Sequence, residues 1–171
     1  KVIAYAPHSI ASFHAIFTGI YGVNNGVDSY FGTPDFKEEQ CKTITEYMKE
    51  AGYYCLGDSM NDLIVPRKGF DKLIEQEPFK EFKDIHKELI REIGNKNKEG
   101  QYCFAHLHCS YAHNDVVEEF IKKYKKDEAE FYNNVERNKE VYKKSLQKVE
   151  DYLKEITQAL EEHNLVENST I

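Results

Sequence analysis

The residues with the clearest chemical potential lie near the start of the chain, in the segment APHSIASFHAIFTG. Ser9 follows Pro7 and precedes a helical run that ends before Gly19, so a helix is expected to begin at or beside Ser9. A serine hydroxyl at this point serves one of two purposes. It caps the helix by accepting a backbone N–H, or it attacks an anionic ester that the free N–H groups and the helix dipole attract.

Histidines supply the candidate acid–base groups. His113 follows a predicted strand, in the polar sequence AHND, and is expected in a loop at the carboxyl end of a parallel sheet. An imidazole there either binds a substrate oxygen or protonates a leaving alkoxide, or it is a surface histidine of no special role. His108, nearer the strand interior, is expected to be structural. His14 is turned about 140° away from Ser9 on a helix, so it is expected to be packed inside the fold.

The elements that must position these residues alternate between strand-like and helical patterns. Three short runs rich in aromatic and β-branched residues predict strands, namely VIAYA (2–6), YYCLG (53–57) and YCFAHLHC (102–109). Helices are predicted over 40–52, over 84–93 and from Asp115 almost to the end of the chain. Because parallel strands need crossover connections, this order predicts an α/β fold with a mostly parallel sheet and helices on both faces.

The long last helix has an apolar stripe that defines its predicted buried face. The stripe consists of Tyr142, Leu146, Val149, Leu153, Ile156 and Leu160. It lasts less than three heptads, which favours a helix laid on a sheet over a coiled coil.

Composition narrows the class of protein. The 171 residues are 40% hydrophobic and 13% aromatic, which predicts one globular domain over 1–171. The net charge of −7 comes from intermixed Lys and Glu, which argues against nucleic-acid and anionic-membrane partners. The four cysteines lack the spacing of a zinc site and are expected to be free thiols. No apolar run reaches the roughly 18 residues of a membrane span.

The opening segment, taken as SIASFHAIFTGIYGVNNGV, resembles the nucleophile motif of the sulfatase family in the alkaline phosphatase superfamily. In that motif a Cys, Ser or Thr is followed by a small residue or proline, by a serine and by Thr-Gly. The matching residues here are Ser9, Ala11, Ser12, Thr18 and Gly19. The turn IYGVNNGV is similar to the family's YP..HGV. The resemblance places Ser9 at the nucleophile position.

Further segments keep the family's order along the whole chain. TITEYMKEAGYYCLGD resembles its helix and strand, and GFDK (69–72) resembles its GFD. FAHLHCSYAHND is similar to its LH..DPHDPY strand end, with His108 and His113 at the two histidine positions. The last 30 residues resemble the helix that leads to the family's L.(D/E)NT, with Asp151 at the position of its Asp.

This resemblance implies an alkaline phosphatase-like domain, present here as its central part and incomplete at both ends. The implied function is a metal-dependent hydrolase of sulfate or phosphate esters, acting on a small-molecule, glycan or lipid ester. Ser9 is then the nucleophile and a ligand of a divalent ion (Ca, Mn, Mg or Zn), and His108 and His113 bind substrate. The other metal ligands are expected outside this chain, so the chain alone is expected to be inactive.

Departures from the family pattern bear on the reaction. Phe13 stands where formylglycine-type sulfatases have arginine, and GDSMND lacks their Lys and His. These differences argue against conversion of Ser9 to formylglycine and favour direct attack by the serine on phosphorus. They leave open a phosphoethanolamine- or phosphoglycerol-type transferase, and a noncatalytic binding domain that kept the fold.

Overall fold

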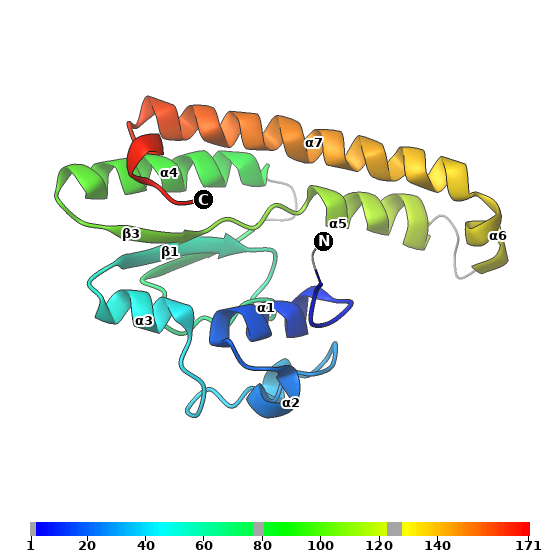
Figure 1. Ribbon diagram of the computed structural model, residues 1–171, viewed down its shortest axis with the longest axis horizontal. Coiled ribbons are helices and arrows are strands. Elements are labelled where there is room, and N and C mark those ends of the chain that lie inside the picture. Colours follow the sequence, from blue (N-terminus) through cyan, green and yellow to red (C-terminus); the bar gives the residue numbers. More distant parts are fainter. Residues whose placement is uncertain (1–2, 77–80, 123–127) are drawn as a thin grey trace. The chain divides into compact units, whose positions relative to one another are not determined.

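The computed structural model describes residues 3–76, 81–122 and 128–171, and it has an α/β fold (Figure 1). The chain divides into two compact units. The first contains Lys1–Lys80 and Glu92–His108, and the second contains Glu81–Arg91 and Cys109–Ile171. The division falls inside a single helix, α4 (Phe82–Lys98).

The first unit is built on a three-stranded parallel sheet. Its central strand is β1 (Tyr54–Ser59), flanked by β2 (Lys72–Glu75) and β3 (Cys103–His106). In the register, Leu56 of β1 lies opposite residue 72 on one side and residue 105 on the other. The sheet confirms the predicted α/β class and the strands predicted over 53–57 and 102–109. The four-residue β2 was not predicted, because its sequence KLIE is short and flanked by charges.

The strand predicted over 2–6 is wrong for the described residues 3–6, which form an irregular segment that bends into the first helix. Ser12 gives the physical reason. Its hydroxyl donates to the carbonyl of Ala6 at 3.0 Å and accepts the Ala6 N–H at 3.3 Å. The backbone groups of Ala6 that would join a sheet ladder are therefore already bonded. Val2 lies outside the described residues.

Helices cover both faces of the sheet, as predicted. Neighbouring residues of β1 point to opposite faces. On one face, Cys55 Sγ lies 3.3 Å from the carbonyl of Thr45 in α3 (Ile44–Glu50). On the other face, the Tyr54 hydroxyl donates to Glu92 of α4 at 3.1 Å. The α3 face also carries α1 (Ser9–Thr18) and, beyond it, the short helix α2 (Gly22–Asn25) (Figure 1).

The core of the first unit gathers around α1. Its buried apolar residues are Ile10, Ala11, Phe17, Val27, Ile64 and Val65. They come from α1, from the segment after α2 and from the loop between β1 and β2. The segment that contains Ser9 therefore also contributes Ile10, Ala11 and Phe17 to the core.

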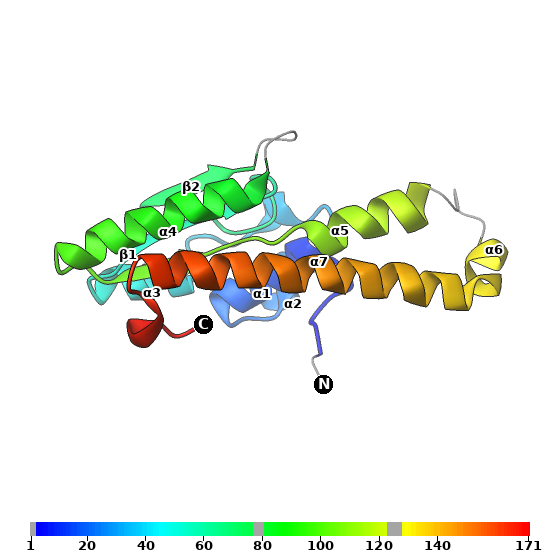
Figure 2. The ribbon, with the colours of Figure 1, turned by 90° about the horizontal axis from the view of Figure 1, so that it is seen from above.

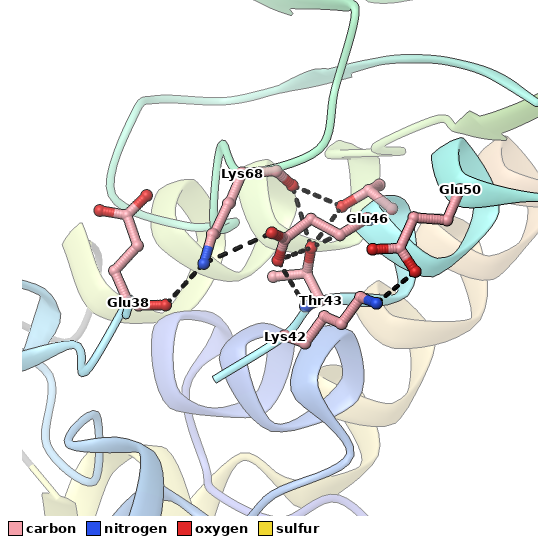
Figure 3. Close-up of polar contacts among 7 residues, drawn as sticks. Glu38, Lys42, Thr43, Glu46, Glu50 and Lys68 are labelled. Carbon is pink, nitrogen blue, oxygen red and sulfur yellow. Dashed lines mark hydrogen bonds and ion pairs between the residues drawn. The ribbon is translucent and has the colours of Figure 1, made fainter. Parts of the chain in front are cut away.

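The first turn of α3 is joined to the loop that precedes β2 (Figure 3). Thr43 and Glu46 form a capping box, in which each side chain bonds the other's backbone N–H. The hydroxyls of Thr43 and Thr45 both donate to the Lys68 carbonyl, at 3.0 and 2.6 Å. The next residue, Gly69, has φ +87°, and a Cβ there would overlap the backbone N of Glu46. The GFD segment therefore begins with glycine because the loop presses against α3.

The second unit is helical. After the first part of α4 it contains α5 (Tyr111–Val116), a π-helical turn (Val117–Lys122), α6 (Glu128–Asn133), α7 (Val135–Glu162) and a short 3₁₀ turn (Val166–Asn168). Figure 2 shows α5 running beside α7. The predicted helical character from Asp115 onward is confirmed for the described residues, although α6 and α7 are separate helices.

The buried face of α7 differs from the predicted stripe. Its buried residues are Ser145, Tyr152, Ile156, Ala159 and Leu160, whereas Tyr142, Leu146 and Leu153 are exposed. The buried polar groups are bonded, which is why they are tolerated inside. Ser145 donates to the Val141 carbonyl at 3.2 Å, and the Tyr152 hydroxyl lies 2.7 Å from His86 Nδ1. Among the described residues, no helix is long and apolar enough to cross a membrane.

Candidate functional site

Ser9 is the first residue of α1, and it does not cap the helix. The N-cap is His8, whose extended backbone (φ −138°, ψ 154°) places its Nδ1 where it accepts the Ala11 N–H at 3.5 Å. The capping interpretation of Ser9 is therefore wrong. Ser9 is half-buried, and it lies in the first turn, where helix N–H groups lack partners within the helix.

Ring contacts show where the start of α1 lies along the sheet. Phe13 and Phe17 both lie 5.3 Å from the His106 ring, measured between ring centroids, and Phe13 also lies 5.3 Å from the His108 ring. Moving toward the start of α1 thus means moving toward the end of β3. Ser9 is one turn before Phe13 on the same helix face. It therefore lies past His108, at the carboxyl end of the sheet, where α/β folds bind ligands.

A buried carboxylate joins the three strands at this end. Asp58, at the end of β1, accepts the His108 backbone N–H at 2.8 Å and the Gln76 side-chain N–H at 2.7 Å. Gln76 also donates to the His108 carbonyl at 2.7 Å. Asp58 is fully buried and His108 nearly so, in agreement with the structural role expected of His108. Asp58 and Gln76 were not predicted from the sequence, although Asp58 is an acidic residue directly after the apolar run YYCLG and so gave a usable signal.

The later part of the opening motif is architectural. The Thr18 hydroxyl donates to the His14 carbonyl at 2.7 Å and accepts from the side chain of Asn25 at 3.3 Å. Asn25 is fully buried, and its Oδ1 accepts the Val27 N–H at 2.8 Å. Gly26 has φ +95°, and a Cβ there would overlap the Asp35 carbonyl. These residues fix the turn that follows α1.

His14 is packed inside the fold, as predicted. It is 1% exposed, its ring lies 4.9 Å from that of Phe36, and its Nδ1 lies 2.9 Å from the Ile10 carbonyl. Burial lowers the pKa of His14 below its ordinary value, against the opposing effect of that hydrogen bond. His14 is therefore a neutral core residue near pH 7.

His113 lies in helix α5 and is exposed, so the loop predicted for it is wrong. Two residues earlier, Tyr111 packs on Phe82 with ring centroids 4.6 Å apart. Burial and the nearby Glu81 carboxylate raise the pKa of Tyr111 to about 12. Tyr111 is therefore a neutral packing residue. His113 belongs to the second unit and Ser9 to the first, and their joint action stays a prediction.

The described part of the chain does not form a metal site by itself. Within it, no three side chains of His, Cys, Asp or Glu come together as a group that could hold an ion. A divalent ion needs several such ligands. The metal-binding role of Ser9 therefore stays a prediction, and no reaction step is derived through an ion.

A family model of the sulfatases matches residues 2–171. The chain belongs to the sulfatase family. Its fold is accordingly alkaline phosphatase-like, and the resemblance drawn from the sequence is confirmed. Sulfatases are ester hydrolases that generally use a divalent metal ion. Neither the curated proteins nor the solved structures gave a match.

In this member of the sulfatase family the departure at Phe13 is part of the packing. The Phe13 ring contacts the rings of His106 and His108. Phe13 also packs against the buried apolar core around α1, a contact that an arginine side chain would replace with a charged group. The residue at position 13 is thus part of the packing of α1 against the end of β3.

Proposed function

We propose that this chain is the central part of the catalytic domain of a hydrolase of sulfate or phosphate esters, with Ser9 as the nucleophile. Family membership supports the reaction class. The observation that carries the choice of Ser9 is its place in the first turn of α1, at the carboxyl end of the sheet, with the capping role already filled by His8. Small-molecule esters are the substrates that the family suggests.

The proposed reaction has two steps. First the Ser9 hydroxyl proton passes to a general base, Oγ bonds to phosphorus or sulfur, the bond from that atom to the alcohol oxygen breaks, and the alcohol oxygen takes a proton. Water then cleaves the seryl ester and releases phosphate or sulfate. The backbone N–H groups of Ser9 and Ile10, in the first helical turn, would stabilise the anionic group during both steps. The substrate-binding roles of His108 and His113 rest on the family resemblance alone.

The absence of the family's arginine at position 13, and of its Lys and His in GDSMND, favours direct attack by an unmodified serine, and hence phosphate over sulfate esters. It also keeps a transferase as the second candidate. In that case an alcohol replaces water in the second step, as in phosphoethanolamine or phosphoglycerol transfer. Products formed with and without an added acceptor alcohol separate hydrolysis from transfer.

The decisive experiment compares Ser9→Ala with Ser169→Ala, because Ser169 is an exposed serine outside the proposed site. The full-length protein is supplied with Mg²⁺, Mn²⁺, Ca²⁺ or Zn²⁺ and assayed on 4-nitrophenyl phosphate and 4-nitrophenyl sulfate. Ser9→Ala is expected to lower turnover by at least about 10³-fold with little change in the thermal midpoint, while Ser169→Ala leaves both unchanged. Normal turnover by Ser9→Ala contradicts the nucleophile assignment. Absence of turnover in the unmodified protein favours a binding domain.

A further inference from the structure

Exposed aromatic side chains form two contacting pairs in the segments that precede and follow α1. Tyr5, Tyr21, Tyr30 and Phe31 are 37%, 67%, 56% and 85% exposed, and we call these four residues the aromatic rim. Single exposed apolar residues are common, but several that touch one another on one surface mark a binding site. The rim is therefore a feature that packing does not account for.

Ring contacts connect the rim to the site. The Tyr30 ring meets the His8 ring edge-on, with centroids 5.6 Å apart, and Phe31 meets Tyr30 in the same manner at 5.0 Å. His8 is the residue before Ser9 and caps the same helix. Tyr5 and Tyr21 stack on each other at 5.3 Å. The rings of His8, Tyr30 and Phe31 thus form a row that starts one residue from the proposed nucleophile and ends at the exposed Phe31, and Tyr5 and Tyr21 form a second pair.

The backbone holds the rim in place. The Gly32 N–H donates to the Ser29 carbonyl at 3.2 Å, which closes a tight turn around Tyr30 and Phe31. Just beyond this turn, the Thr33 hydroxyl donates to the carbonyl of Leu63, in the loop after β1, at 3.2 Å. A preformed surface costs little entropy when a ligand orders on it. The aromatic rim is thus suited to bind, and not only to fill space.

The charges around the rim limit its ligand. Residues 2–36 contain no lysine or arginine, and they contain the acidic residues Asp28 and Asp35. The next residue, Lys37, donates its ammonium group to the Asn24 carbonyl at 3.0 Å. A second phosphate or sulfate on the alcohol would therefore find no cation among residues 2–36. Edge-to-face contacts also leave ring faces open, and do not form the box of rings that a quaternary ammonium group prefers. An uncharged ring is the group that suits this surface.

We propose that the aromatic rim is the subsite for the alcohol half of the ester, and that it selects an alcohol with an apolar ring face over a short or charged alcohol. The proposal rests on the proposed function, because it uses Ser9 as the point of attack. The shared chemistry is stacking on an exposed aromatic ring, which both a phenyl ring and a sugar ring can supply. Phosphoethanolamine and phosphoglycerol substrates lack such a ring.

The test measures dissociation constants of the full-length protein, with divalent ion present, for phenyl phosphate, glucose 6-phosphate, phosphocholine and inorganic phosphate. Phenyl phosphate, glucose 6-phosphate or both are expected to bind about tenfold more tightly than inorganic phosphate, and their order identifies the kind of ring. Phe31→Ala and Tyr30→Ala are expected to remove most of this gain, with a rise of about fivefold to tenfold in Kd. Binding of inorganic phosphate should not change.

The chain offers a matched control in Tyr132, which is 68% exposed and meets its neighbour Phe131 edge-on at 5.4 Å, much as Tyr30 meets Phe31. Tyr132→Ala should leave every dissociation constant unchanged. Equal loss in Tyr132→Ala and Phe31→Ala, no loss in either rim variant, tighter binding of phosphocholine than of both ring ligands, or no binding of any probe overturns the subsite. If the rim variants behave as expected but Ser9→Ala turns over substrate normally, the proposed nucleophile fails and the ring-binding site stands.

Discussion

The two ends of the parallel sheet hold their carboxylates in different ways. At the amino end, Asp71 accepts the Cys55 backbone N–H at 2.9 Å and pairs with Lys49 at 2.6 Å. Glu92 pairs with Lys72 at 2.5 Å and accepts from the Tyr54 hydroxyl. At the carboxyl end, Asp58 is bonded by a backbone N–H and an amide side chain.

The pKa values at the amino end reflect its ion pairs. Burial raises the pKa of Asp71, but the bonds from Lys49 and Cys55 outweigh it, so the pKa is lowered overall. The Lys72 bond lowers the pKa of Glu92 in spite of burial, and the Tyr54 bond adds to this effect. Charge at this end is thus matched within the fold, whereas the carboxyl end combines Ser9, helix N–H groups and exposed rings. The family segments at the amino end of the sheet therefore stabilise the fold, whereas those at the carboxyl end contain the residues of the proposed site.

Removing the carboxylate of the carboxyl end should have the largest effect on stability. Asp58→Ala is expected to lower the free energy of unfolding by about 3 kcal/mol, because it leaves the buried His108 N–H and one N–H of the Gln76 side chain without their acceptor. Urea unfolding measures the change. Asp62→Ala, an exposed acidic neighbour, is the control and should stay within about 0.5 kcal/mol. Equal stability of the two variants would mean that Asp58 does not lock the strand ends.

Two glycines near the amino end of the sheet test whether contact with α3 requires a residue without a side chain. Gly69 and Gly52 have nearly the same φ, +87° and +86°, but only Gly69 is pressed against α3, and a Cβ on Gly52 would meet nothing within 4 Å. Gly52→Ala is expected to cost about 1 kcal/mol from backbone strain alone. Gly69→Ala should cost about 1 to 2 kcal/mol more, because the Cβ also displaces backbone. Thermal midpoints measure both. The same shift in the two variants would show that contact with α3 does not require glycine.

The ion pairs predict a pH dependence of smaller size. Asp71 and Glu92 have folded pKa values below their ordinary values of 3.8 and 4.5. Between the folded and the ordinary values the unfolded chain binds more protons, so stability rises with pH in that range. The stabilisation is complete above about pH 5 and is lost as the pH falls through the lowered folded values.

Urea unfolding between pH 7 and pH 3 measures this loss, whose slope is at most about 1.4 kcal/mol per pH unit for each proton bound. Replacing both partners, with Lys49→Met and Lys72→Met, should flatten the curve below pH 5. The double substitution Lys139→Met and Lys154→Met removes exposed lysines of α7 and should leave the slope as it was. A slope that persists in the first double variant would place the titrating groups elsewhere.

Short sequence segments were enough to predict those elements that depend on interactions between residues close together in the chain. The run YYCLG predicted β1, Thr43 and Glu46 are spaced as a capping box, and the spacing of Ser9 and Thr18 identified the family. The strand predicted over 2–6 failed because Ser12, six residues after Ala6, binds the Ala6 backbone. The stripe predicted on α7 was right at Ile156 and Leu160 but wrong at Tyr142, Leu146 and Leu153, which are exposed. The buried face includes Ser145 and Tyr152 instead, whose hydrogen-bond partners apolarity does not reveal.

The site was harder to predict because its contacts join distant residues. Asp58 meets partners 18 and 50 residues further along the chain, and no periodicity signals such a pairing. The aromatic rim depends likewise on the contact of Tyr30 with His8, which lies 22 residues earlier in the chain and is separated from it by two helices. The nucleophile position could be named from its motif, but its surroundings required the fold.

Helix α4 has a consequence for how this chain can be divided. The helix is continuous, yet its first part, with the buried Ile85, Leu89 and Ile90, belongs to the second unit and its last part to the first. Each unit consists of two segments that are not consecutive in the chain, so dividing the chain at any single point leaves at least one unit incomplete. Recombination therefore cannot transfer either unit as one continuous segment of sequence. Insertions should be tolerated in the loops and not within α4, where the two units divide.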